Sequence, residues 1–264
     1  MWRNLARLIR HRGLIQSLVA RELKARYRGS VLGFFWSFIN PLILLTIYSV
    51  VFATFLPMRS ELIEPYGLFL FCGILPWTWF SASLTEASTS LVAGANLIRK
   101  VMFPAEVLPL VSVLSNMMHF LLGLPILAGF LLYFEHTPDL VDLLWFPVVV
   151  AIQLVFTAGL ALLLAALTTF FRDIRDLLSH ILTFWFFATP IIYPWFQKGL
   201  EPYRTWFKWN PFTHLAVSYQ ELLFFDGPFG QLPWLLLLGA LSIVFFLIAY
   251  WVFDRLRDSY AEVV

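Results

Sequence analysis

Charged residues are scarce in this chain. Asp, Glu, Lys and Arg make up 13% of its 264 residues, about half of the roughly 25% found in soluble domains. Six segments contain none of these four residue types, and each is at least 21 residues long: 29–58, 65–85, 107–134, 143–171, 177–197 and 227–253. A membrane-spanning helix needs about 20 apolar residues. This scarcity excludes an ordinary soluble domain, and the continuous apolar runs do not fit the alternating pattern of barrel strands.

Other absences narrow the function. The chain has one cysteine, Cys72, so it forms no intrachain disulfide. Its five histidines are scattered and form no cluster with the spacing of a metal site, and we expect no metal and no cofactor on this chain. No G-x-x-x-x-G-K-[S/T] motif occurs, so any ATP and Mg must be bound by a separate polypeptide. Proton- or sodium-coupled transporters usually bury ionisable groups near the midplane of the membrane, and this chain offers none there.

These features predict an all-α integral membrane fold with six transmembrane helices in a single domain, residues 1–264. The expected spans are about 31–56, 66–90, 107–134, 143–170, 177–194 and 232–253. Residues 195–230 are too polar to span and too aromatic for a free loop, which predicts re-entrant outer helices between spans 5 and 6. Within this segment, Pro211 after Asn210 indicates a helix start.

The distribution of Lys and Arg predicts the orientation. Fourteen of the 18 Lys and Arg residues lie in the N-terminal segment or after the second, fourth and sixth spans. Because cytoplasmic segments carry the excess of Lys and Arg, we expect both termini in the cytoplasm. The first 13 residues are basic and do not resemble a cleavable signal. No feature besides the basic N-terminus favours nucleic-acid binding, and membrane contact explains that feature better.

Residues 14–28 fit an amphipathic helix in the membrane interface. Its apolar face carries Ile15, Leu18, Val19, Leu23 and Tyr27. Its basic residues are Arg21, Lys24, Arg26 and Arg28. One interpretation is a simple membrane anchor. The other is a helix beside the opening where a lipid enters a transporter, with these basic residues meeting the lipid phosphate.

Two local features belong to this helix. Glu22 and Arg26 are four residues apart and can form an ion pair. Gly29 and Gly33 allow the chain to turn from the interface into the first span.

Aromatic residues form helical stripes in the first two spans. The stripes are Phe34, Phe38, Tyr48, Phe52 and Phe55 in the first span, and Tyr66, Phe69, Trp77 and Phe80 in the second. Such rings commonly face lipid or pack between helices. They can also stack on sugar rings and so line a path for a polysaccharide. Both interpretations stay open for each residue.

Two short charged elements lie on the predicted cytoplasmic side. Residues 96–109 contain Pro104, which breaks a helix, and Glu106, which restarts one near its N-terminus. Residues 171–178 carry alternating Arg and Asp. Both can be ordinary polar turns, or they can receive force from a soluble motor.

Five motifs occur in order along the chain: KARYRGSVLGFFWSFINPL, NLIRKVMFPAEVLPL, FFRDIRDLL, ATPIIYP and WNPF. Together they resemble the permease subunit of ABC type-2 polysaccharide exporters, which serve O-antigen, capsule and teichoic-acid export. The resemblance covers essentially the whole chain. It implies a homodimer in the bacterial inner membrane, bound to two copies of a cytoplasmic ABC ATPase. It also implies a cargo polysaccharide linked to undecaprenyl pyrophosphate, as in lipopolysaccharide biosynthesis.

The resemblance also implies roles for particular residues. The residues expected to contact the ATPase are Asn96, Arg99, Lys100, Phe103, Pro104, Glu106, Arg172, Asp173, Arg175 and Asp176. The sugar path would include the aromatic stripes and Trp185. The alternatives are an ABC type-2 permease for another lipid or a drug, and an integral-membrane glycosyl- or acyltransferase. An enzyme would need clustered His or carboxylates at the membrane face. The only candidate cluster, Arg172–Asp176, alternates acids with arginines as ion pairs do, so we expect no catalytic residue.

Overall fold

A computed structural model describes residues 11–51, 63–100, 103–197, 199–225, 230–257 and 259–260, without the side chains of Phe34, Arg99 and Lys100. Within these ranges the chain is helical and contains no strand. The longer helices are α2 (Arg12–Arg26), α3 (Trp36–Val50), α4 (Tyr66–Ala93), α6 (Val107–Tyr133), α7 (Leu140–Phe170), α8 (Asp173–Phe187), α10 (Pro211–Leu223) and α11 (Leu232–Arg255). The shorter ones are η1 (Gly33–Phe35), α5 (Ala95–Lys100), η4 (Glu201–Tyr203) and α9 (Arg204–Trp209).

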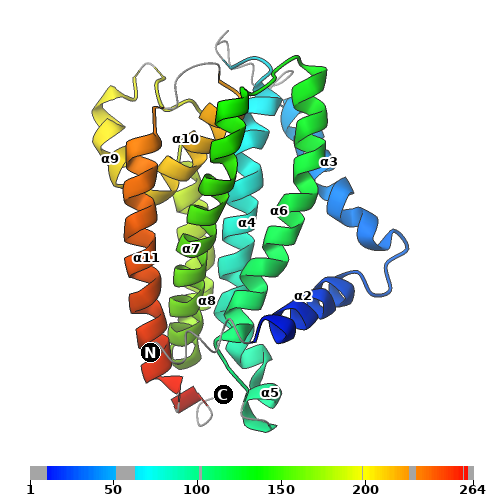
Figure 1. The fold of residues 1–264 in the computed structure, drawn as a ribbon, viewed down its shortest axis with the longest axis vertical. Helices are drawn as coiled ribbons and strands as arrows, with labels where there is room; N and C mark the ends of the chain where they lie inside the picture. The colour runs from blue at the N-terminus through cyan, green and yellow to red at the C-terminus, as the bar shows by residue number, and fades with distance from the viewer. Residues whose placement is uncertain are drawn as a thin grey trace.

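The long helices stand side by side as a bundle (Figure 1). Helix α2 lies across one end of this bundle, near α5, whereas α9 and α10 lie at the opposite end. Leu18 of α2 is buried against Val107 and Val111 of α6, so the predicted apolar face of the interfacial helix packs on protein. Gly29 and Gly33, with φ of +83° and +49°, make the turn from α2 to α3 in the left-handed region that glycine adopts readily.

Helix α4 forms the centre of the bundle. It packs against α3, α6, α7, α8 and α10, and 83% of its most apolar stretch is buried, against 28% in α11. Nevertheless α4 is the least apolar of the four long helices and α11 is the most apolar. A helix surrounded by protein can carry polar groups that find partners, whereas a helix that faces lipid cannot. For example, Gln153 of α7 donates a hydrogen bond of 2.9 Å to the carbonyl of Pro76 in α4.

Four helices in the described part of the chain are long and apolar enough to cross a membrane: α4, α6, α7 and α11. They correspond to the second, third, fourth and sixth predicted spans. Helix α3 is apolar but 15 residues long, and residues 52–62 of the first predicted span lie outside the described residues. The arrangement of six spans therefore stays a prediction.

The fifth predicted span, 177–194, differs from the helix found there. Helix α8 begins at Asp173 and ends at Phe187. Pro190 follows shortly after this end, and a proline disfavours helical geometry at the residue before it. The charged residues predicted as a turn thus form the first helical turn, with Asp173 and Asp176 at the positive end of the helix dipole.

Helices are present between α8 and α11 as predicted, although their position relative to a membrane stays a prediction. Asn210 caps α10, because its side chain accepts a hydrogen bond of 3.1 Å from the backbone N–H of Phe212. Pro211 occupies the first turn, and the predicted helix start is confirmed.

Candidate functional site

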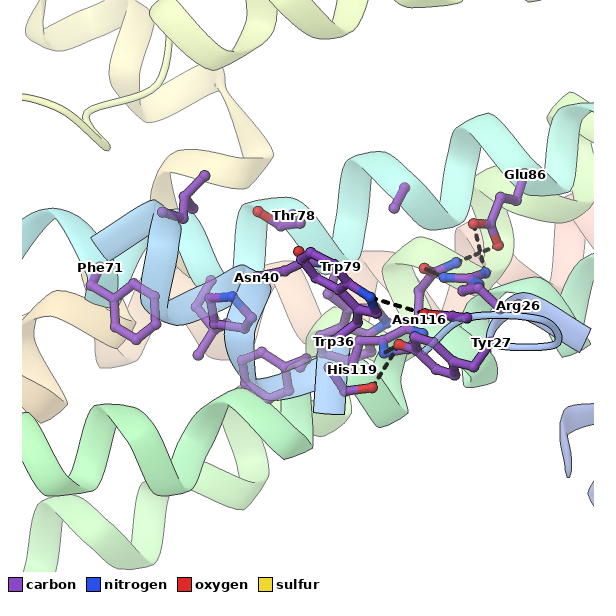
Figure 2. A pocket seen from close by; sticks show the side chains of 17 residues that line it. Arg26, Tyr27, Trp36, Asn40, Phe71, Thr78, Trp79, Glu86, Asn116 and His119 are labelled. Atoms are coloured by element: carbon purple, nitrogen blue, oxygen red, sulfur yellow. Dashed lines mark hydrogen bonds and ion pairs between the residues drawn. The ribbon is translucent and has the colours of Figure 1, made fainter. Parts of the chain in front are cut away.

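A cavity of about 550 Å³ lies between α2, α3, α4 and α6. This volume is in the range of small-molecule sites. Figure 2 shows Arg26, Glu86 and Asn116 toward one end of it and Phe71 at the other, with Trp36, Asn40, Thr78 and Trp79 between them. Its lining residues are Arg26, Tyr27, Ser30, Trp36, Ser37, Asn40, Pro41, Leu44, Phe71, Leu75, Thr78, Trp79, Ala82, Glu86, Asn116, His119 and Phe120.

Three side chains close one end of the cavity. Arg26, the last residue of α2, donates to Glu86 of α4 at 2.7 Å and to the amide oxygen of Asn116 of α6 at 3.2 Å. Asn116 in turn donates to the second oxygen of Glu86 at 2.7 Å. Each residue contacts both others, so this Arg26–Glu86–Asn116 network holds the end of the interfacial helix to two long helices (Figure 2).

The segment between α2 and α3 is tied to the same wall. The hydroxyl of Tyr27 lies 2.6 Å from the hydroxyl of Ser37 and 3.2 Å from Nδ1 of His119. The indole N–H of Trp36 donates to Ser30 at 3.0 Å. These contacts place hydroxyl, imidazole and indole groups beside the network.

The end of the cavity away from Arg26 carries Phe71 (Figure 2). Pro41, Leu44 and Leu75 are further apolar lining residues. Phe71 and Glu86 are 15 residues apart on α4, which corresponds to about 22 Å along the helix axis. A cavity with a charged network at one end and an aromatic ring at the other suits an amphiphile, with its head near Arg26 and its chain toward Phe71.

The four basic residues of the predicted lipid-phosphate site differ in their surroundings. Arg26 pairs with Glu86 on α4, rather than with Glu22, which the sequence also allowed. The carboxylate of Glu86 binds both Arg26 and Asn116. Arg26 also donates to Asn116, so pairing with Glu86 gives it a second partner. Arg21, Lys24 and Arg28 are exposed and form no ion pair within the described ranges.

The residues predicted to contact an ATPase lie at the bundle end that carries α2 and α5 (Figure 1). Arg172, Asp173, Arg175, Asp176 and Asn96 are exposed there. Phe103 and Pro104 are half-buried, and Phe103 packs against Leu18, Val107 and Val111. The side chains of Arg99 and Lys100 lie outside the described residues. The exposed residues are available to a partner, and their role stays a prediction.

Glu106, also predicted to contact the ATPase, has a different environment from the exposed residues. Its side chain is buried and accepts a hydrogen bond of 2.7 Å from Arg257, beyond the end of α11. Burial alone would lower the pKa of Arg257, but the carboxylates of Glu106 and Asp254 raise it above its usual value. The pair joins the start of α6 to the C-terminal end of the described chain, and nothing in the local sequence pattern points to Arg257.

The aromatic stripe of the second predicted span points into the protein core. Phe69 and Phe80 are fully buried, and Trp77 and Tyr66 nearly so. Phe80 packs against Trp185 of α8 and against Phe156 and Phe212, with ring centroids 4.7–5.8 Å apart. In the first predicted span, Phe38 and Tyr48 are half-buried, whereas Phe52, Phe55 and the side chain of Phe34 lie outside the described residues. In this conformation the rings of Phe69 and Phe80 serve packing, and the sugar path stays a prediction.

A second groove, of about 420 Å³, runs between α3, α4 and α8. Aromatic residues Tyr48, Trp77 and Phe186 line it. So do five hydroxyl side chains: Thr78, Ser81 and Thr85 of α4, and Ser179 and Thr183 of α8.

Sequence reasoning missed this groove. The three hydroxyls on α4 recur at intervals of three and four residues, which places them on one helix face. That spacing is a visible pattern, but it does not reveal the facing pair on α8.

Comparison with known proteins agrees with these features. Residues 13–224 match the ABC-2 type transporter family. An O-antigen export system permease protein RfbA of Myxococcus xanthus is 40% identical over 263 residues, 99% of each chain. A protein of the same name from Klebsiella pneumoniae is 32% identical over 255 residues, 95% of each chain. The polysialic acid transport protein KpsM of Escherichia coli is 22% identical over 218 residues, 78% of this chain and 80% of KpsM. The chain therefore belongs to the ABC-2 type transporter family and is a multi-pass membrane permease, which confirms the resemblance found in its motifs.

Proposed function

We propose that this member of the ABC-2 type transporter family is the membrane subunit of an ATP-driven exporter of lipid-linked polysaccharide, with undecaprenyl pyrophosphate as the lipid carrier. In this proposal two copies of the chain form a homodimer in the inner membrane, and two copies of a separate cytoplasmic ATPase bind it. Relatives that match it over nearly their whole length are named as O-antigen export permeases, which supports this cargo class over a drug.

The observation that carries the proposal is the groove between α3, α4 and α8. Each of its five hydroxyl groups donates to a carbonyl three or four residues back in its own helix, for example Thr78 to Ile74 at 2.9 Å and Thr183 to Ser179 at 2.9 Å. A hydroxyl oxygen keeps two acceptor lone pairs. The groove therefore offers a row of acceptors for sugar hydroxyls, beside the rings of Tyr48, Trp77 and Phe186.

The helices that flank this groove expose apolar faces. Ile43 and Ile47 of α3 and Ile181 and Phe184 of α8 are all exposed. A second copy of the chain packed on these faces would close the open groove into a passage. A row of weak acceptors and aromatic faces suits a polymer that must slide, because no single contact holds it strongly.

The amphiphilic cavity fits the lipid carrier in the same scheme. Arg21, Lys24 and Arg28 on the exposed face of α2 attract the pyrophosphate, and Arg26 receives it by exchanging Glu86 for a phosphate oxygen. ATP binding to the partner acts on Asn96–Glu106 and Arg172–Asp176 and separates α3 and α8 of the two copies. The polymer then moves outward along the groove.

The groove hydroxyls provide the direct test. Replacing both Thr78 and Thr183 with Val removes two acceptors while keeping the side-chain shape. An ordinary hydrogen bond contributes about 1 kcal/mol, so we expect export of surface polysaccharide to slow several-fold in a host that lacks its own copy. Thr46→Val is the matched control, because Thr46 is an exposed, backbone-bonded hydroxyl on α3 outside the groove.

Two outcomes would contradict the proposal. Export at the normal rate in the double variant would exclude the groove as the sugar path. Purification of the chain from its native host without a P-loop ATPase would exclude the ATP-driven scheme as a whole.

A further inference from the structure

We propose that a pocket between α9, α10 and the start of α11 binds a single sugar ring. Helices α9 and α10, which form part of its wall, lie at the bundle end opposite α2 (Figure 1). Its volume is about 270 Å³. A volume just below the range of drug-sized sites suits a ligand as small as one sugar ring.

Aromatic side chains form part of the wall. Trp195, Phe207 and Trp234 line the pocket. Trp234 stacks on His214, with ring centroids 5.5 Å apart and planes at 6°. His214 is itself fixed by the carbonyl of Lys208 at 3.0 Å and by Gln231 at 3.3 Å. One face of Trp234 is thus held in place, and a rigid ring is a suitable surface for the C–H groups of a sugar.

The polar lining offers both donors and acceptors. Arg204 and Lys208 of α9 lie on one side and form no ion pair within the described residues. Glu221 of α10 is half-buried on the other side, and one of its oxygens accepts a hydrogen bond of 3.0 Å from the backbone N–H of Gln231. A sugar hydroxyl both donates and accepts, so such a mixed lining matches it.

One buried group in the pocket has no partner. Thr213 is 4% exposed, and its buried hydroxyl makes no hydrogen bond within the described part of the chain. Buried polar atoms are nearly always bonded, and an unpaired one indicates a missing water or ligand. Thr213 lines the pocket, and a rotation of its side chain about χ1 would bring the unpaired hydroxyl to a bound sugar.

The carboxyl group of Glu221 distinguishes this lining from a purely cationic phosphate site. Burial raises the pKa of Glu221 to about 7, so near neutral pH the group is present in both forms and can accept from a sugar hydroxyl or donate to a sugar oxygen. The pocket is separate from the groove between α3, α4 and α8, so this inference goes beyond the proposed export function.

The single, fully buried Cys72 makes a thiol-protection experiment practical. Gly230→Cys places a reactive thiol in the pocket without removing any side chain, because a Cβ there would approach only Glu221, at 3.6 Å. Thr205→Cys is the matched control, since Thr205 is exposed on α9 and does not line the pocket. The probes are galactose, mannose, N-acetylglucosamine and galacturonate, with the full chain in nanodiscs together with any ATPase that co-purifies.

We expect at least one of these sugars to slow methanethiosulfonate labelling several-fold at Gly230→Cys and to leave Thr205→Cys unchanged. Adding Trp234→Ala or Thr213→Val should remove the protection while the rate without sugar stays the same. Equal rates with all four sugars would overturn the proposal. Protection by anionic phospholipid in the nanodisc, but by none of the sugars, would assign the pocket to a lipid headgroup instead. Because the assay requires neither ATP nor export, its failure would leave the export proposal standing.

Discussion

Two arginine–glutamate pairs join distant parts of this chain with the same 2.7 Å contact. The Arg26–Glu86 pair is accessible, with side chains 28% and 36% exposed. In the Arg257–Glu106 pair the arginine is 29% exposed, but the glutamate is only 2% exposed. Because the contact length is equal, the difference in burial decides how much each pair contributes to stability.

Burial makes the second pair a structural element. A carboxylate removed from water needs its counter-ion, because an unpaired buried charge costs several kcal/mol. Glu106 lies just before α6 and Arg257 just beyond α11, so their contact fixes two chain segments 151 residues apart. The raised pKa of Arg257 keeps it charged at every accessible pH. Its stabilising effect is fully present below the ordinary arginine pKa, and we expect no loss of it at neutral or moderately alkaline pH.

Exposure leaves the first pair free to exchange partners. Water already solvates both groups in part, and an accessible ion pair contributes about 0–1 kcal/mol. Breaking it therefore costs little, which suits the proposed exchange of Glu86 for a phosphate oxygen. The Arg257–Glu106 pair thus stabilises the fold, whereas the Arg26–Glu86 pair is suited to a binding step.

The largest effect is expected from Arg257→Ala. This change leaves Glu106 buried without its cation and should lower the free energy of unfolding by about 3 kcal/mol. Thermal unfolding of the purified protein would measure it. Arg255→Ala is the matched control, because Arg255 is exposed on the same terminal turn and lies over the ring of Trp251. A second variant that adds Glu106→Gln should recover part of the loss, and no recovery would show that Arg257 acts by packing alone.

A smaller effect on stability is expected from Arg26→Ala. We expect a loss below about 1 kcal/mol, together with a clear fall in polysaccharide export. Stability and export are measured on the same variants, with Arg12→Ala as a control for a basic residue at the other end of α2. If Arg26→Ala destabilises the protein as much as Arg257→Ala does, the distinction between the two pairs is wrong.

The smallest expected effect is the response of the two variants to salt. The screening length falls from about 8 Å at physiological ionic strength to about 3 Å at 1 M. High salt should therefore shrink the stability difference between wild type and Arg26→Ala by a few tenths of a kcal/mol. The difference caused by Arg257→Ala should change less, because Glu106 is shielded from solvent. Equal salt responses would mean that both pairs are solvated alike.

Local sequence patterns predicted the parts of the fold that depend on residues close together in the sequence. The charge-free segments gave the positions of α4, α6, α7 and α11, and Asn210 with Pro211 gave the start of α10. The fifth predicted span was less accurate. The charged residues just before it form the first turn of α8, because acids are favoured at a helix N-terminus and need no separate loop.

The candidate site was predicted only in outline. An amphipathic helix at residues 14–28 was predicted, and its apolar residue Leu18 packs on α6. The sequence allowed Arg26 to pair with Glu22, four residues away. Its partner is Glu86, 60 residues away. Helical periodicity compares positions within one helix, so it has no access to a contact made by another helix.

The sequence by itself determined that this chain is a helical, multi-pass membrane protein. Long segments without charge can enter lipid only as helices, since lipid offers no partner to backbone N–H and C=O groups. Only the tertiary structure decided which helix is central, which glutamate each arginine meets, and where the cavities lie. The physical reason is that lipid and a protein interior both accept apolar side chains. Apolar composition alone therefore does not distinguish α11, which is mostly exposed, from α4, which is wrapped by protein. Helix α4 carries Glu86 of the cavity and three of the five groove hydroxyls.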